Sequence, residues 1–384
     1  MLEVLVKLLI TLLIIVLVLS LAFILFLLFI SRGEIEPFLT EDSLVIEDSI
    51  AEKIQLEING ADQGMIIRGK NKNNPVLLFV HGGPGVPEYF LNETYPTALE
   101  DHFTVCWWEA RGGGLSYDDR LSADEISLSL LVDDAIAVSE YLLARFDQEK
   151  IYLLGHSFGS LIGIKLAAER PDLFYAYIGM AQVSGGELSG ERANTLTYRY
   201  MIDYFQSVGD EHAIGLLNRW SQIQPDGTVV FDPNYLGKID ELKHQAGCGT
   251  MHEMKSVISG IFFPQLFSRA YSIGEKINFW KGKAFMRYSR AYQEMLELDL
   301  FAENLQVEIP VYFFSGIYDY TCPYPLMKEF FDRLEAQEKA FYTFHDSAHS
   351  PLWEEPDKAL EILLEDVLSG KMNLSDPCVN HRRY

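Results

Sequence analysis

Three residues far apart in the chain could together perform nucleophilic catalysis, and Ser157 is the first of them. It lies at the centre of GHSFG, residues 155–159, the only Gly-x-Ser-x-Gly pattern in the sequence. The apolar run 151–154 before it is typical of a buried strand, and residues 161–168 after it favour a helix. A sharp strand-to-helix turn strains its central residue and lifts that side chain clear of the sheet. Ser157 is therefore the candidate nucleophile, and the alternative is a glycine-rich turn with an incidental serine.

A serine hydroxyl needs a base to take its proton, and the base needs an acid to fix its tautomer. In a parallel sheet these partners follow later strands, in the order serine, acid, histidine. Asp319 follows the apolar run 310–314, and His349 follows the run 339–344. Order and placement both predict a triad of Ser157, Asp319 and His349.

Two neighbouring residues compete for these roles. His345 comes at the end of its predicted strand, where a ring is more often packed or capping, whereas His349 lies further into a loop of small residues. Asp346 is a weaker alternative acid because it would have to act from the histidine's own loop. Asp319 could also be a turn-capping aspartate.

An acyl-transfer site also needs amide donors for the developing oxyanion. The N–H of Phe158, directly after the nucleophile, is one candidate. The second is the N–H of Gly83, within HGGPG at residues 81–85, which follows the buried run 76–80. The alternative is that this glycine-proline segment only turns the chain.

Strand and helix patterns alternate along most of the chain, which predicts a mostly parallel sheet with helices on both faces. Between residues 182 and 304 strand signals become scarce and helical spacing dominates. We interpret this segment as a helical insertion over the carboxyl edge of the sheet, with a separate helical domain as the alternative. The polar tail from Ser369 is expected to fray.

The N-terminus predicts a membrane anchor. Residues 8–30 carry no charge, and as a helix they would extend about 34 Å, enough for a bilayer core. A cleaved signal peptide is less consistent with the length of this run and with the absence of a small-x-small cleavage site. We expect a single-pass protein that contacts the lipid bilayer through this helix, with its catalytic domain outside the cytoplasm.

The composition of the chain limits which kinds of function it could have. The 384 residues carry 31 basic and 55 acidic side chains, a formal charge of −24, which argues against nucleic-acid binding. The four cysteines form no CxxC pair, and Cys248 with His252 lacks two further convincing metal ligands. No metal or organic cofactor is implied.

These motifs resemble the proline iminopeptidase (prolyl aminopeptidase) branch of the α/β-hydrolase superfamily. The resemblance rests on HGGPG, on EARGGGLS at residues 109–116, on GHSFGS, on Asp319 and on HSP at residues 349–351. It implies the α/β-hydrolase fold, the triad above and an oxyanion hole of Gly83 and Phe158. The implied organisation is an anchor at 4–30, a linker at 31–51, a hydrolase core at 52–181 and 305–368, and a helical cap at 182–304.

The same resemblance implies cap carboxylates that bind the free amine of a substrate. Glu191 is our candidate for this role, and Glu187, Glu294 and Glu297 are the alternatives. The chain departs from the branch at its elbow, which often reads GGSWG, and at Glu109, where an aspartate is usual.

The leading functional hypothesis is a membrane-anchored serine hydrolase that releases N-terminal residues, with proline preferred, through an acyl-enzyme. Its substrate would be a small peptide or a small ester or amide. The alternative enzyme is an esterase or lipase acting on small or amphiphilic esters. The alternative of another class is a non-catalytic binding protein that keeps the hydrolase fold.

Overall fold

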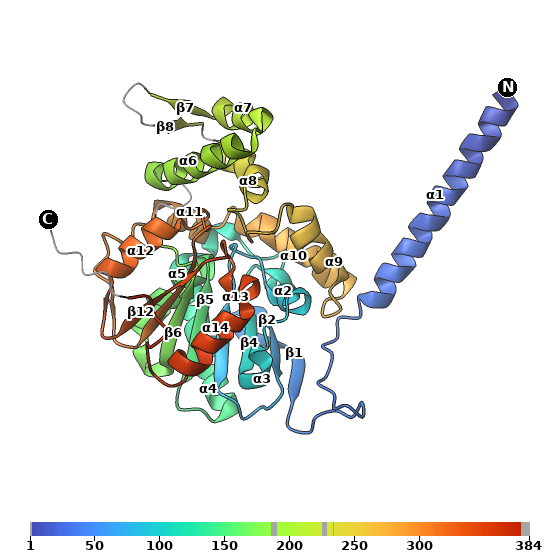
Figure 1. Cartoon of the computed structure of the whole chain (residues 1–384). Helices are drawn as coiled ribbons and strands as arrows, with labels where there is room; N and C mark the ends of the chain where they lie inside the picture. Colours follow the sequence, from blue (N-terminus) through green and yellow to red (C-terminus); the bar gives the residue numbers. More distant parts are fainter. Residues whose placement is uncertain (1, 186–189, 225–228, 233, 378–384) are drawn as a thin grey trace.

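The computed structural model describes residues 2–377 except 186–189, 225–228 and 233 (Figure 1). Within these residues the main sheet has eight strands in the order β1-β2-β4-β3-β5-β6-β10-β12. The strands β1 and β2 pair antiparallel, β2 pairs antiparallel with β4, and the remaining neighbours are parallel. The strand bounds are β1 Ile50–Ile58, β2 Ala61–Gly69, β3 Val76–Val80, β4 Thr104–Glu109, β5 Ile151–His156, β6 Phe174–Met180, β10 Val311–Gly316 and β12 Lys339–Phe344.

Both faces of this sheet are covered because its central strands are apolar on both sides. In β3, Val76, Leu78 and Val80 belong to one core cluster, whereas Leu77 and Phe79 belong to the other. This is the side-chain period of two expected of a strand buried on both faces. Together with the parallel pairing of all neighbours from β4 to β12, this confirms the mostly parallel sheet that the sequence predicts.

Helices on opposite faces complete the two clusters. One face packs against α4 Leu128–Phe146, α5 Phe158–Glu169 and α12 Tyr324–Arg333, and the other against α2 Tyr89–Thr94, α3 Leu99–His102, α13 Pro351–Glu354, α14 Pro356–Ile362 and the π-helical η5 Leu363–Val367. Short 3₁₀ turns lie at η1 Gly114–Ser116, η2 Ala123–Glu125 and η3 Pro171–Leu173. Two two-residue strands, β9 Gln306–Val307 and β11 Glu335–Ala336, pair separately.

The insertion between β6 and β10 is mostly helical and lies above the sheet in Figure 1. Its elements are α6 Glu191–Val208, α7 Glu211–Arg219, β7 Ser221–Ile223, β8 Val229–Phe231, α8 Tyr235–Gln245, the π-helical η4 Ile258–Phe262, α9 Phe263–Phe267, α10 Ile273–Met286 and α11 Arg290–Glu297. Part of the insertion, from α6 to α8, has a small core of its own. The segment thus combines its own packing with contacts to the hydrolase core.

The two ends of the described chain differ in their packing. The helix α1 Leu2–Ile30 projects away from the sheet, with almost all its side chains exposed. Within the described residues the tail after Ser369 is held in place, which the sequence did not suggest: the N–H of Asp376 donates to Phe341 O at 2.8 Å and Asn373 N–H donates to Asp366 at 2.9 Å. These contacts hold the tail as far as Asp376 against β12 and η5.

Candidate active site

Ser157 stands at a tight turn between β5 and α5. Its φ of 53° is positive, which is strained for a residue other than glycine, and its N–H donates to Met180 O at 3.0 Å. A Cβ at Gly155 would lie 2.5 Å from Gly159 O, and a Cβ at Gly159 would lie 2.1 Å from Val80 O. Both glycines are therefore required for the close approach of strand and helix that presents Ser157.

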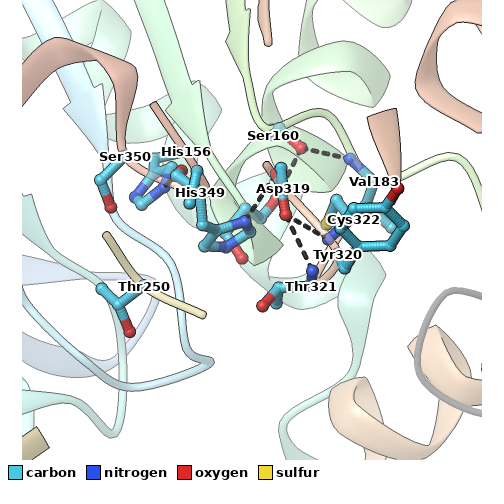
Figure 2. Close-up of polar contacts among 12 residues, drawn as sticks. His156, Ser160, Val183, Thr250, Asp319, Tyr320, Thr321, Cys322, His349 and Ser350 are labelled. Carbon is cyan, nitrogen blue, oxygen red and sulfur yellow. Dashed lines mark hydrogen bonds and ion pairs between the residues drawn. The ribbon is translucent and has the colours of Figure 1, made fainter. Parts of the chain in front are cut away.

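His349 and Asp319 meet as the order of the residues predicts. The Nδ1 of His349 lies 2.9 Å from Asp319 Oδ2, and both side chains are buried (Figure 2). A carboxylate only accepts hydrogen bonds, so Nδ1 of His349 carries a proton, and in the neutral ring Nε2 then has a free lone pair. A histidine in this tautomer can accept a proton from a hydroxyl.

The carboxylate of Asp319 is itself held by the chain that follows it. Its Oδ1 accepts the N–H groups of Thr321 at 2.9 Å and Cys322 at 2.8 Å (Figure 2). These two main-chain donors fix the orientation of the Asp319 carboxylate. Asp319 is thus more than a turn cap, since its second oxygen faces the imidazole.

Ser157 and His349 line one pocket with a volume of about 220 Å³. In the part of the chain that the structure describes, no hydrogen bond joins their side chains. The pocket is shared between the hydrolase core, which contributes Gly83, Glu88, His156 and Thr321, and the insertion, which contributes Asp240, His244, Thr250, Val257, Ile261 and Lys283. The predicted cap segment therefore forms part of the wall around Ser157.

The predicted oxyanion donors lie at the same place. Phe158 is the first residue of α5, where main-chain N–H groups have no partner within the helix. Gly83 lines the pocket with a φ of 117°, a conformation open to glycine. A Cβ at Gly82 would lie 3.0 Å from Ser157 Cβ, so the HGGPG loop passes directly beside the serine.

A buried pair beside the nucleophile was not predicted from the sequence. His156 Nδ1 lies 2.8 Å from Glu88 Oε1, and His156 Nε2 donates to the main-chain oxygen of His349 at 2.8 Å. Burial opposes charge on the ring, but the facing Glu88 carboxylate raises the pKa of His156 above its usual value. Glu88 Oε2 is buried without a hydrogen-bond partner among the described residues.

A second group missed from the sequence holds the loop of His349. Glu354 Oε1 accepts the N–H groups of Ala348 and Ser350, each at 3.0 Å, and these residues flank the histidine. Glu354 Oε2 accepts the N–H of His252 from the insertion at 2.5 Å. Burial raises the pKa of Glu354 to about 7, although these three donors act in the opposite direction.

The competing residues do not join the site. His345 and Asp346 are exposed, so the choice of His349 and Asp319 agrees with the packing. Among the cap carboxylates, Glu294 accepts the N–H of Leu128 at 2.7 Å and Glu297 is exposed. Glu191 begins α6, but its side chain lies outside the described residues, as does Glu187.

Comparison with known proteins identifies the class. A family profile for the alpha/beta hydrolase fold matches residues 75–356. The chain belongs to the α/β-hydrolase fold family, as the motifs indicated.

Three individual proteins are similar to this chain over most of its length. The sequence is 31% identical over 310 residues to the probable aminopeptidase YbaC of Bacillus subtilis (strain 168), covering 80% of this chain and 93% of the relative. The crystal structure of proline iminopeptidase from Mycobacterium smegmatis matches with a TM-score of 0.57 and 15% identity, covering 83% of this chain and 98% of that one. The crystal structure of a membrane phospholipase A matches with a TM-score of 0.52 and 15% identity, covering 96% and 99%. The two structures show the shared fold.

Proposed function

We propose that this chain is a membrane-anchored serine hydrolase that releases N-terminal residues from small peptides. The observation that carries the proposal is the buried hydrogen bond between His349 and Asp319 at the edge of a pocket that also contains Ser157. The 31% identity to a relative named as a probable aminopeptidase supports the choice of substrate class.

The proposed reaction has two steps, each moving one proton through His349. Ser157 Oγ attacks the carbonyl carbon while its proton passes to His349 Nε2, and the N–H groups of Gly83 and Phe158 stabilise the oxyanion. Collapse breaks the amide bond, and the leaving amine takes the proton from His349. Water then attacks the acyl-enzyme by the same route and frees the acid and the serine.

A carboxylate oxygen with no hydrogen-bond partner in the described part of the chain supports a substrate with a free amine, in a pocket whose wall also carries His156 and Lys283. Glu88 and Asp240 both line it, and the buried Glu88 Oε2 has an unused acceptor site among the described residues. An ammonium group is a donor of matching charge for such an oxygen. The proposed amine-binding carboxylate, Glu88, therefore belongs to the hydrolase core, whereas the sequence suggested carboxylates of the cap.

Esterase activity is the second candidate function, and the apolar part of the pocket wall favours it. Apolar side chains form much of the rest of the pocket wall: Val86, Phe90, Leu91, Val257 and Ile261. Such a surface suits an acyl chain as well as a proline ring.

The membrane part of the proposal depends on α1. Within the described residues α1 is the one helix long and apolar enough to cross a bilayer, with a mean hydropathy of 3.5 in its most apolar window. We place the catalytic domain outside the cytoplasm.

Parallel assays separate the alternatives. We expect the full-length protein to hydrolyse a proline arylamide with a free amine faster than the N-acetylated arylamide or a short acyl ester. A fluorophosphonate probe should label the wild type but not Ser157→Ala. Turnover of the esters alone would reject the peptidase, and the absence of an adduct on folded protein would favour a non-catalytic binding protein.

A further inference from the structure

The helix formed by η4 and α9 has an unusual distribution of side chains. Its exposed face carries Ile258, Phe262, Phe263 and Phe267, with 62%, 39%, 41% and 41% of their surface accessible. Two polar residues, Gln265 on the other face and Ser268 directly after the helix, are buried, as is the apolar Ile261. A surface helix of a water-soluble domain normally has polar side chains on its exposed face. The apolar face therefore fits a non-aqueous partner.

Polar contacts fix this orientation. Gln265 Oε1 accepts the indole N–H of Trp280 at 3.1 Å, and the Ser268 hydroxyl donates to the Glu93 carboxylate. Turning the helix to bury its aromatic face would break both bonds and leave buried polar groups without partners. The exposed aromatic residues are thus a consequence of how the helix is held.

The exposed face continues directly into the end of α1. The rings of Phe26 and Phe267 form an edge contact with centroids 6.2 Å apart. Just beyond α1, Lys276 Nζ donates to Ser31 Oγ at 2.7 Å, and Gly33 N–H donates to Arg269 O at 3.2 Å. Figure 1 shows α9 beside the end of α1 that joins the body of the molecule.

The contact between Phe26 and Phe267 fixes the depth of the helix Ile258–Phe267 relative to a membrane. The uncharged residues 8–30 of α1 extend about 34 Å, slightly more than the roughly 30 Å of a hydrocarbon core, so the last turn of α1 reaches the headgroup region. Phe26 lies four residues, or about 6 Å, before the end of α1. A side chain in contact with Phe26 then lies at the boundary between headgroups and acyl chains.

The same helix also forms a wall of the Ser157 pocket. Val257 and Ile261 line that pocket, whereas Ile258 and Phe262, each one residue further along, are exposed on the outer face. One layer of helix therefore separates the nucleophile's pocket from the apolar surface.

We propose that the helix Ile258–Phe267 is a second membrane contact, which inserts its aromatic face into the lipid interface and brings the Ser157 pocket close to the bilayer surface. The occupant of this face is lipid, because the face is continuous with the apolar surface of α1. The inference rests on the membrane anchoring in the proposed function and is independent of the reaction.

Site-specific fluorescence quenching in liposomes tests the inference on the full-length chain. Cysteine is introduced at Phe263, at Val230 on β8 as an exposed apolar control, and at Leu17 as a control within α1, each in a Cys378→Ser background. Cys106, Cys248 and Cys322 are buried. Each protein is labelled with an environment-sensitive dye and reconstituted in phosphatidylcholine vesicles with or without doxyl-labelled lipid.

We expect blue-shifted emission and roughly twofold or greater quenching at positions 263 and 17, and neither effect at position 230. Quenching at 17 without quenching at 263 would overturn the second contact and leave the anchor intact. A label at 263 that is blue-shifted but not quenched would place protein on this face, which also overturns the inference. If the label at 17 is not quenched, the anchoring and the inference both fail, while hydrolytic activity stays a separate question. Unchanged activity of Phe263→Cys controls for folding.

Discussion

The orientation of His349 depends on one carboxylate. Asp319 Oδ2 holds the Nδ1–H of the ring at 2.9 Å, and this leaves Nε2 free to act as the base. In Asp319→Asn the amide can donate to Nδ1 and stabilise the wrong tautomer. We expect kcat on a proline arylamide to fall on the order of 10⁴-fold, with KM little changed.

Asp346→Asn is the matched control for this change, because Asp346 is exposed three residues before His349. Its kcat should equal that of the wild type. Loss of kcat in Asp346→Asn without a loss in Asp319→Asn would show that Asp346, and not Asp319, orients the ring. Circular dichroism of each variant confirms that the fold is retained.

Glu88 provides a test of amine recognition. In Glu88→Gln, Oε1 can still accept from His156, so the support of the His349 main chain is preserved, but the negative charge on Oε2 is lost. We expect KM for an arylamide with a free amine to rise about tenfold or more, because hydrogen bonds to charged groups contribute roughly 1.5–3 kcal/mol. Steady-state kinetics on the amine substrate and on a short ester measure the difference.

The ester has no ammonium group and should react with Glu88→Gln as with the wild type. Glu297→Gln, an exposed change of the same kind, should alter neither substrate's kinetics. An equal loss on both substrates would instead mean that Glu88 acts only through His156.

At the scale of elements, the turn between β5 and α5 sets the position of Ser157, the proposed nucleophile. A Cβ at Gly159 would lie 2.1 Å from Val80 O, a main-chain atom that cannot move without separating β3 from α5. We expect Gly159→Ala to abolish activity and to lower the yield of folded protein. Activity and the thermal unfolding midpoint of the purified variant are the measurements.

Gly215→Ala is the matched control, because it makes the same substitution in another helix. Nothing lies within 4 Å of a Cβ built at this position in α7. Alanine there should stabilise the protein by up to about 1 kcal/mol, since glycine is unfavourable within a helix. Full activity of Gly159→Ala would contradict the steric argument.

We expect the loop between β12 and α13, which Glu354 holds, to make activity sensitive to pH. Glu354 accepts three main-chain N–H groups when ionised, and burial raises its pKa to about 7. As pH falls through this value, a proton occupies one oxygen and displaces a donor, so the loop of His349 loosens. We expect part of the loss of kcat on acidification, on the order of tenfold, to arise from this group.

Glu354→Gln separates this contribution from others. Its amide oxygen can still hold the N–H groups of Ala348 and Ser350, but it has no titratable proton. The pH–rate profile of the variant should lack the component near pH 7, whereas Glu354→Ala should lower kcat at every pH. An identical profile for wild type and Glu354→Gln would reject this role.

The sequence predicted the elbow, the order of Ser157, Asp319 and His349, and the sheet, because glycine spacing and apolar runs record local requirements directly. It did not predict Glu88 or Glu354, although Glu88 lies just after HGGPG and His156 is part of GHSFG. Glu88 accepts from His156, which the tertiary structure brings near, and Glu354 accepts main-chain N–H groups, which every residue type except proline carries. Such acceptors leave no spacing pattern that a sequence can reveal.

At the scale of the whole molecule, two exposed apolar surfaces adjoin each other. They are α1 and the outer face of the helix Ile258–Phe267, which meet at the rings of Phe26 and Phe267. In water both apolar surfaces would stay exposed, which is unfavourable, whereas a protein attached to a bilayer buries both surfaces at once. If α1 and the helix Ile258–Phe267 both insert as proposed, the pocket that contains Ser157 lies close to the bilayer surface.

The stability of the core depends on a buried ion pair that joins three elements. Arg111, after β4, contacts Asp134 of α4 through Nε at 2.7 Å and Nη2 at 2.8 Å, and Nη2 also donates to Ile58 O at the end of β1. Asp134 is fully buried, with 0% of its side chain exposed. In Arg111→Leu this carboxylate would stay buried with only the amide donors of Asn59 and Gln63.

We expect Arg111→Leu to lower the free energy of unfolding by about 3–5 kcal/mol, the usual consequence of leaving one member of a buried pair without its partner. Denaturant unfolding of the detergent-solubilised protein, followed by tryptophan fluorescence, measures the change. The matched control is Arg120→Leu, which removes an exposed contact to Asp118 and should leave the free energy of unfolding unchanged. Because Asp134 is the buried charge in question, the double variant Arg111→Leu/Asp134→Leu should recover part of the loss. Failure of the double variant to improve on Arg111→Leu would show that the guanidinium stabilises the protein through the main-chain oxygens of Ile58 and Asn59 rather than through Asp134.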